Sequence, residues 1–418
     1  MAANRMNWYF GWNIVAAAGT LTLLTVGLRM GIGPFFLPIV EDLGFSRSLL
    51  AAIIAAGMLC YGLAMPLAGY LVARLGTRTV LMLGNAALVG GAVWTVNAKD
   101  PVSFLFAFGI LLSLGLALCS PITLTPVLAK WFVRRRGMAF FFLSTGSMAG
   151  IAILTPLLSA AIEAAGWQNT MLGFAAMYTL IAVPLTLFVI RDQAPPHADA
   201  DLGARPASAV PSSPRPVADS LTLTQAMRTQ PFWKITLGLF ACGYSMNLLG
   251  AHGVPMLMDH GFDATTSSLG IGTIGLVAIF STVLLGRIAD SLPRKQLLAT
   301  IYFVRGLGFF ALLIVGTHWE LYIAAAIGGI VWAGSIAMSS AILADIYGVR
   351  LVGVLYGFAY LGHQIGGTIS SWLGGWGYEQ FGTHWLAFGS AGALLLIAAV
   401  IAIRLPPKDF TLMAPMRA

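Results

Sequence analysis

Long apolar stretches alternate with short polar or basic segments along the chain. A helix that crosses the bilayer needs about 20 apolar residues, because each residue adds about 1.5 Å across a hydrocarbon core of about 30 Å. Cutting the apolar stretches at charges and at Pro and Gly breaks predicts twelve such helices, and hence an all-α membrane protein. The predicted helices are 12–36, 48–72, 79–98, 102–128, 137–161, 170–190, 232–257, 266–286, 296–316, 321–343, 351–376 and 385–404.

The segment 191–230 interrupts this pattern. It is rich in Pro, Ala and Ser and has no apolar period, so it predicts a disordered linker. Six predicted helices lie on each side of it. We therefore divide the chain into an N-terminal six-helix bundle (1–190), the linker (191–230) and a C-terminal six-helix bundle with a short tail (231–418).

The two halves repeat a pattern of glycines and prolines. Three glycines recur at an offset of 216 residues, in the pairs Gly137 with Gly353, Gly146 with Gly362 and Gly150 with Gly366. A second series recurs at an offset of 217, in the pairs Pro38 with Pro255, Gly44 with Gly261 and Gly69 with Gly286. Duplicated hydrophobic halves are how many transporters build a central site between two bundles that move against each other.

The composition agrees with a chain that lies mostly in lipid. Hydrophobic residues make up 58% of it and charged residues 9%, whereas soluble domains carry about a quarter charged residues. Of its 23 Lys and Arg, 19 lie on one predicted side, and Arg47 and Lys99 on the other. This bias predicts that both termini and the linker are cytoplasmic, in a bacterial inner membrane. The basic residues therefore set the orientation of the chain in the membrane. Their positions argue against nucleic acid as a partner.

A sequence motif, GYLVARLGTR, joins the second and third predicted helices. With the two paired halves, it resembles the major facilitator superfamily, whose signature here is roughly G-x-L-x-D-R-x-G-R-R. The first copy keeps Gly69, Arg74, Gly76 and Arg78, and the second copy, GRIADSLPRK, keeps Gly286, Asp290 and Arg294. The resemblance implies a gate in which these charges hold the cytoplasmic side shut. Ala73 replaces the aspartate of the first copy, so that copy lacks its acid.

Three other segments resemble the monocarboxylate and oxalate/formate transporters within that superfamily. They are PFFLPIVEDLGFSRS, KWFVRRRGMA and ADIYGVRLVGVLYGF. The resemblance covers nearly the whole chain outside the linker and implies a small organic anion as substrate. Members of this branch carry an arginine in the eighth helix, beside an acid in the monocarboxylate members. The chain departs from the branch there, because Thr282 and Ala278 occupy the two positions.

Two arginines lie well inside the predicted helices, where no acid does. An ionised side chain there costs about 2.5–3.5 kcal/mol, so each calls for a reason. We expect Arg29 to bind a substrate carboxylate through two parallel hydrogen bonds. The alternative is an arginine that snorkels outward or pairs with Glu41 or Asp42. Arg305 either binds helix-end carbonyls within the C-terminal half or, with its helix turned inward, replaces the missing substrate-binding arginine.

Further polar candidates lie in the seventh and eleventh predicted helices. His363 replaces Ser147 of the first half, and a histidine near mid-membrane can bind a carboxylate or carry a proton. The other substrate-binding candidates are Tyr244, Asn247 and Tyr360, and the second proton-coupling candidate is His252. For each, interhelical hydrogen bonding or core packing is the alternative.

These residues predict a secondary transporter that moves a small, monocarboxylate-like anion by alternating access. We expect it to couple to H⁺, with substrate uniport or anion exchange as the alternatives. We also expect it to work as a monomer and to need no cofactor or metal. The alternative is an efflux pump for drugs or other lipophilic compounds, although pumps for cations usually place acids in the membrane. An enzyme would need clustered His, Asp, Glu or Cys. The six histidines are scattered, and the three cysteines lack metal spacing.

Overall fold

The computed structural model describes residues 9–132, 136–194, 221–288 and 292–407, and within these ranges the chain is helical without strands. Nine helical stretches of the described chain are long and apolar enough to cross a membrane. The predicted all-α membrane fold is therefore confirmed. The count of twelve crossings stays a prediction, because α8 (Arg136–Pro184) and α14 (Gly334–Phe381) each run on for about two crossings.

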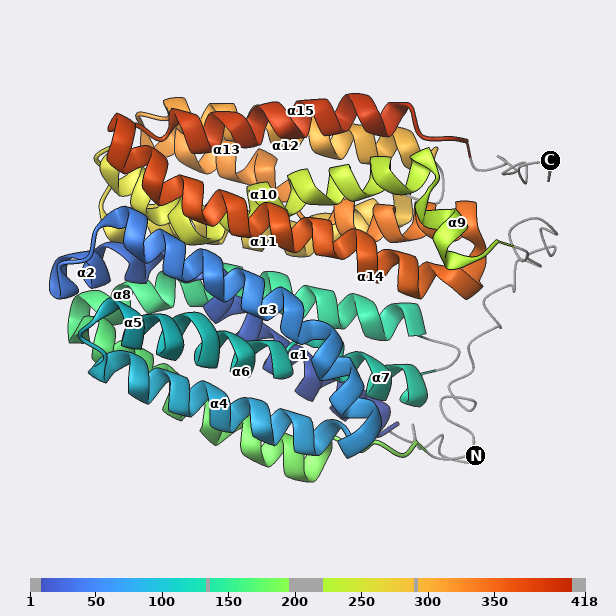
Figure 1. Ribbon diagram of the computed structural model, residues 1–418, viewed down its shortest axis with the longest axis horizontal. Coiled ribbons are helices and arrows are strands. Elements are labelled where there is room, and N and C mark those ends of the chain that lie inside the picture. Colours follow the sequence, from blue (N-terminus) through green and yellow to red (C-terminus); the bar gives the residue numbers. More distant parts are fainter. Residues whose placement is uncertain (1–8, 133–135, 195–220, 289–291, 408–418) are drawn as a thin grey trace, which may run out of the picture.

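The helices form two bundles, which Figure 1 shows one above the other. The N-terminal bundle contains α1 (Gly11–Met30), α2 (Gly33–Leu43), α3 (Arg47–Leu75), α4 (Thr77–Asn97), α5 (Pro101–Phe104), the π-helix η1 (Leu105–Leu112), α6 (Ser113–Leu118), α7 (Pro121–Trp131), α8 and the π-helix η2 (Leu185–Val189). After α9 (Leu223–Met227), the C-terminal bundle contains α10 (Gln230–Asp259), α11 (Ala264–Ile288), α12 (Arg294–Ile314), α13 (His318–Ile330), α14, the π-helix η4 (Trp385–Gly389) and α15 (Ser390–Ile403).

The two ends of the molecule are distinct. The start of α1 and the end of α15 lie at the same end, on the right in Figure 1, and we call this end the terminal side. The starts of α3 and α11 lie at the other end, which we call the opposite side. These names carry no assumption about which side faces the cytoplasm.

Three predicted helices are interrupted. The first breaks after Met30, the fourth between α6 and α7, and the tenth between α13 and α14. Proline lies at the first or second position of α2 and α7, where its missing N–H leaves no helical hydrogen bond unmade. Helix breaks inside a membrane expose backbone carbonyls, which then need donors from neighbouring groups.

Part of the predicted linker is ordered. Thr222 and Gln225 form a capping box that starts α9, and Ala226 is fully buried. The prediction of a disordered linker over 191–230 therefore does not hold for 221–230. Compositional reasoning missed this helix because five residues are too few to show an apolar period.

The repeated glycines produce the same packing in both bundles. A Cβ on Gly150 would lie 2.4 Å from the carbonyl oxygen of Leu23, and a Cβ on Gly366 would lie 2.3 Å from that of Phe240. Leu23 and Phe240 are themselves 217 residues apart. The glycines thus let α1 approach α8, and α10 approach α14, in equivalent ways.

Equivalent residues of the two halves also meet each other. Gly33 and Gly250 are 217 residues apart, and a Cβ on Gly33 would lie 3.0 Å from the carbonyl oxygen of Gly250. Positions related by a twofold axis touch only near that axis. The pseudo-twofold axis between the bundles therefore passes close to this contact, one helical turn from Arg29.

We expect Gly366→Ala to destabilise the protein by about 1–3 kcal/mol, because its Cβ would overlap the α10 backbone. Thermal unfolding of the purified protein in detergent measures the change. Gly173→Ala is the matched control, since no atom lies within 4 Å of its added Cβ. Equal melting temperatures for the two variants would contradict the close helix approach.

Candidate functional site

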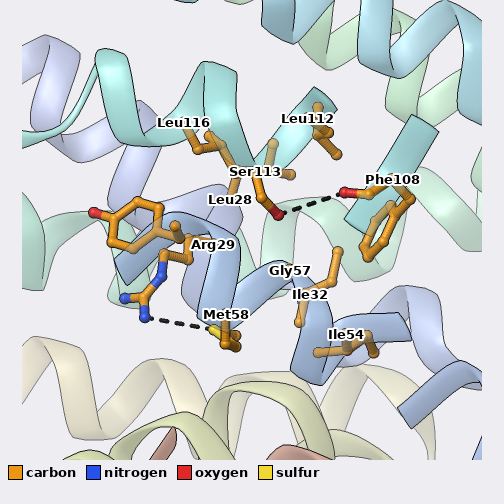
Figure 2. A pocket seen from close by; sticks show the side chains of 11 residues that line it. Leu28, Arg29, Ile32, Ile54, Gly57, Met58, Phe108, Leu112, Ser113 and Leu116 are labelled. Carbon is orange, nitrogen blue, oxygen red and sulfur yellow. Dashed lines mark hydrogen bonds between the residues drawn. The ribbon is translucent and has the colours of Figure 1, made fainter. Parts of the chain in front are cut away.

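Arg29 lies at the end of α1 and joins the two bundles. Its Nη2 donates a hydrogen bond of 2.7 Å to Oδ1 of Asn247 on α10. The same nitrogen lies 3.5 Å from Sδ of Met58, and the guanidinium carbon lies 4.2 Å from the centre of the Tyr61 ring (Figure 2). The charge is thus held by an amide dipole, a thioether and the negative face of an aromatic ring.

No carboxylate among the described residues lies within ion-pair distance of Arg29. Its Nε is buried and has no hydrogen-bond partner. Asp42, one of the acids considered for it, instead accepts hydrogen bonds from Trp167 and Gln168. The guanidinium therefore keeps a positive charge and a free donor at the bundle interface.

His363 and Tyr360 lie on α14. The imidazole of His363 is buried, both its nitrogens lack partners, and its ring stacks on that of Tyr360 at 4.7 Å between centroids. Tyr360 packs against the hydrophobic core of the N-terminal bundle. A Cβ on Gly367, one helical turn from His363, would lie 2.3 Å from Nδ2 of Asn247, the partner of Arg29. The structure thus brings Arg29, Asn247, Tyr360 and His363 together.

Two other predicted residues have partners elsewhere. The hydroxyl of Tyr244 lies 2.8 Å from Oγ of Ser390 on α15, inside the C-terminal bundle. Nε2 of His252 lies 2.6 Å from the carbonyl oxygen of Ser371, and its ring packs edge-on against Phe36. Neither makes a contact with Arg29.

Arg305 is fully buried inside the C-terminal bundle. Its Nη2 donates to the carbonyl oxygens of Val331, at 2.7 Å, and Trp332, and its Nη1 lies 3.2 Å from Sγ of Cys242. Both carbonyls lie in the break between α13 and α14, where helical hydrogen bonding stops. The structure places Arg305 on helix-end carbonyls, the first of the two positions considered for it.

The first copy of the gate motif contacts its own bundle. Gly76 has a φ of +80° and starts α4, whose Thr77 N–H donates to the carboxylate of Asp192. Nε of Arg78 donates to the carbonyl oxygen of Ile190 at 2.6 Å, while the guanidinium of Arg74 lies over the ring of Tyr70. Asp192, which sequence reasoning missed, thus provides an acid beside the motif. The one feature of the sequence that could have indicated Asp192 is its position just after the sixth predicted helix.

The second copy of the gate motif also contacts its own bundle. Nη1 of Arg294, at the start of α12, binds Oδ2 of Asp345 on α14 at 2.6 Å. Gly286 lies within α11, and Asp290 lies outside the described residues. The described gate contacts on the terminal side thus stay within one bundle, and the role of the motif as a gate between bundles remains a prediction.

An ion-pair cluster joins the bundles on the opposite side. Arg47, at the start of α3, donates two hydrogen bonds of 2.5 and 2.9 Å to the carboxylate of Asp259 at the end of α10. Nε2 of His384 lies 2.9 Å from Oδ2 of Asp259, and the Arg47 guanidinium lies over the ring of Tyr378. We call these four residues the opposite-side cluster.

Sequence reasoning missed this cluster although the repeat offered a signal. Asp259 is the partner of Asp42 at the offset of 217. Asp42 accepts from Trp167 and Gln168 inside its own bundle, whereas Asp259 reaches Arg47 in the other bundle. The two copies of this acid thus differ. Asp42 binds within its own bundle, whereas Asp259 binds across the two bundles.

Helices α3 and α14 lie together on the opposite side and separate toward the terminal side. A Cβ on Gly375 would lie 2.3 Å from that of Ala51, and a Cβ on Gly62 would lie 2.8 Å from that of Gln364. Two helical turns further toward the terminal side, on the same helix faces, lie Gly69 and Gly357. An added Cβ at either has no atom within 4 Å. The bundles therefore meet up to the middle and diverge beyond it.

Two repeated helical bundles with an arginine side chain between them have the architecture of a transporter. The model of the Major Facilitator Superfamily matches residues 18–317 and 254–412, and the chain belongs to this superfamily. It is a multi-pass membrane transporter of a small molecule and not an enzyme.

Individual relatives agree over most of the chain. It is 25% identical to YcxA, an uncharacterized MFS-type transporter of Bacillus subtilis, over 88% of this chain and 86% of that one. It is 26% identical to human monocarboxylate transporter 11, over 95% and 83% of the two chains. It is 24% identical to the oxalate:formate antiporter of Oxalobacter formigenes, over 95% and 92%.

Solved structures show the same fold. A D-xylose-proton symporter matches with a TM-score of 0.73 at 18% identity, over 97% of this chain and 100% of that one. The xylose transporter XylE of E. coli, in an inward open conformation, matches with a TM-score of 0.72 at 15% identity, over 95% and 97%. The major facilitator fold inferred from the sequence is confirmed.

The opposite-side cluster yields a prediction about pH. Burial raises the pKa of Asp259, but hydrogen bonds and charge from His384 and Arg47 outweigh it and lower this pKa to about 2. A depressed pKa stabilises the contact fully above the ordinary value of 3.8, and the stabilisation is lost as the pH falls through about 2.

We therefore expect the coupling between Arg47 and Asp259 to be the same at pH 8 and pH 5. A double-mutant cycle with Arg47→Ala and Asp259→Ala, read by thermal unfolding at both pH values, measures it, and we expect about 0.5–3 kcal/mol. A coupling that disappears at pH 5 would contradict this prediction.

Proposed function

We propose that this transporter moves small organic anions of the monocarboxylate type across a bacterial inner membrane by alternating access. The observation that carries the proposal is the charge of Arg29. It lies at the bundle interface, close to the pseudo-twofold axis, and has no carboxylate partner among the described residues. A substrate carboxylate supplies the missing negative charge.

The geometry of Arg29 suits a carboxylate. Its Nε is free, and a guanidinium presents Nε and an Nη in the parallel arrangement that matches two carboxylate oxygens. The hydrogen bond from Nη2 to Asn247 crosses from one bundle to the other. A carboxylate that competes with Asn247 for the guanidinium changes the contact between the bundles, and this links binding to their movement.

The names of the relatives support an anion as the substrate of this transporter. A monocarboxylate transporter and an oxalate:formate antiporter align with 95% of the chain each. The alternative, an efflux pump for lipophilic drugs, has no corresponding observation in the site. Cationic drugs in particular would face the guanidinium without any described acid beside it.

The charge distribution orients the transporter in the membrane. The sequence predicts 19 of its 23 Lys and Arg on the side of the two termini, and the positive-inside rule assigns that side to the cytoplasm. The parts of α3 and α14 that diverge beyond the contact of Gly62 with Gln364 then face the cytoplasm. The bacterial relative YcxA supports a bacterial membrane.

We further propose that His363 couples transport to H⁺. Its two ring nitrogens are buried without partners, beside Tyr360 and near Asn247, the partner of Arg29. An unpartnered imidazole in an apolar interior is costly to charge on its own. An anion bound at Arg29 reduces that cost, so the proton and the anion stabilise each other and move together.

We expect Arg29→Ala to reduce anion uptake into proteoliposomes at least a hundredfold. Arg29→Lys should restore only part of it, because an ammonium lacks the parallel donors. Arg404→Ala is the matched control, since it removes an exposed arginine at the end of α15. The readout is uptake of a labelled acid such as lactate. Full uptake by Arg29→Ala, or transport of a cationic dye by the unchanged protein, would overturn the proposal.

We expect His363→Gln to flatten the pH dependence of uptake. The unchanged protein should take up anion faster as the outside pH falls from 8 to 5, because a symported proton is then more available. His252→Gln serves as the comparison, since His252 already binds a backbone carbonyl. Uptake by His363→Gln that keeps the full pH dependence would remove His363 from proton coupling.

A further inference from the structure

A pocket inside the N-terminal bundle lies beside Arg29 (Figure 2). It has room for about three water-sized groups. The residues that line it come from α1, α3, η1 and α6, and most are apolar. Those that bear on the argument are Leu28, Ile54, Phe108, Leu112, Leu116 and Arg29 itself.

The polar atoms around the pocket give it one charged end. Oγ of Ser113 is directed to the carbonyl oxygen of Phe108, at 3.4 Å. The Arg29 guanidinium lies at one edge, beside Met58, while Ile54, Phe108 and Leu112 lie away from it (Figure 2). The pocket thus combines a cation at its rim with a hydrocarbon wall, and this pattern fits an amphiphilic anion rather than water or an inorganic ion.

The backbone is irregular where it forms the wall. Phe108 and Leu112 lie on η1, a π-helix of eight residues within the fourth predicted span. Single π-helical turns inside helices are rare and occur frequently at functional sites, because the wider turn displaces side chains from the regular helical register. In η1, Phe108 and Leu112 line the pocket while Ile110 is partly exposed.

We propose that this pocket holds the hydrocarbon tail of the substrate while Arg29 holds its carboxylate. The substrate class is then an aliphatic monocarboxylate with a tail of about three carbons. This inference rests on the proposed function. A second carboxylate in the pocket would lose its hydration without a partner, so dicarboxylates are excluded. A single-carbon acid such as formate has no hydrocarbon tail that could contact the apolar wall of the pocket.

The affinity for the acid should increase with each carbon of its tail until the pocket is full. Each CH₂ moved from water into an apolar site is worth about a fourfold gain in binding. We therefore expect the concentration of competing acid that halves the uptake of labelled butyrate to fall severalfold from acetate to propionate, and again to butyrate. It should stop falling at hexanoate and octanoate, whose tails exceed the pocket. Oxalate should compete no better than acetate.

The experiment compares two phenylalanine substitutions on η1. Leu112→Phe fills the pocket, because Leu112 is 2% exposed and lines it, whereas Ile110→Phe adds the same bulk at a position that is 37% exposed. In proteoliposomes, with protein-free vesicles to subtract passive entry, Leu112→Phe should weaken competition by butyrate at least tenfold, so that butyrate no longer competes better than acetate. Ile110→Phe should match the unchanged protein.

A second variant tests the pocket by enlarging it. Leu116→Ala removes part of the wall and should move the best competitor to a longer acid, which a merely misfolded protein cannot do. Competition that is independent of chain length, while Arg29→Ala still abolishes uptake, would overturn the pocket proposal and leave the proposed function standing. Uptake that survives Arg29→Ala would refute the proposed function itself.

Discussion

A positive charge without a counter-charge, held in apolar surroundings between two bundles, is the constraint on which this structure depends. Placing Arg29 in the membrane costs about 2.5–3.5 kcal/mol. A hydrogen bond from a charged donor returns about 1.5–3 kcal/mol, and a cation–π contact about 0.5–2 kcal/mol. Asn247 and Tyr61 together therefore roughly offset the cost. The protein thus tolerates Arg29 without a described acid beside it, and the guanidinium charge is left for the proposed anion.

Arg305 shows the other way to keep a guanidinium in a membrane. The break between α13 and α14 leaves carbonyls without helical donors, and Arg305 supplies them. These carbonyls give the guanidinium of Arg305 partners inside its own bundle, although its Nε, like that of Arg29, has no hydrogen-bond partner. The two arginines differ because Arg305 binds backbone carbonyls of one bundle, whereas Arg29 binds an amide side chain across the two bundles.

The contacts between the bundles are unequal along the membrane normal. Small residues let α3 and α14 touch at Gly375 and Gly62, and the bidentate pair of Arg47 with Asp259 adds a charged contact on the opposite side. Toward the terminal side the same helix faces separate at Gly69 and Gly357. In the proposed alternating-access cycle, glycine at these positions would leave room for the two helices to approach.

The sequence by itself determined the class of fold, because apolar length and the glycine repeat are local or periodic properties. It also identified Arg29 and His363, since a charged or polar residue in an apolar stretch is visible without coordinates. Whether Arg29 has a partner was decided only by the tertiary structure. It placed Asn247 beside Arg29, separated Tyr244 and Arg305 from it, and paired Asp259 with Arg47.

The physical reason is that a contact depends on the rotation and crossing of helices far apart in the chain. Composition and spacing do not fix these. The breaks in the first, fourth and tenth predicted helices show what sequence reasoning misses. Sequence hydropathy runs through them, but the carbonyls and donors they free are matched only when neighbouring helices are in place.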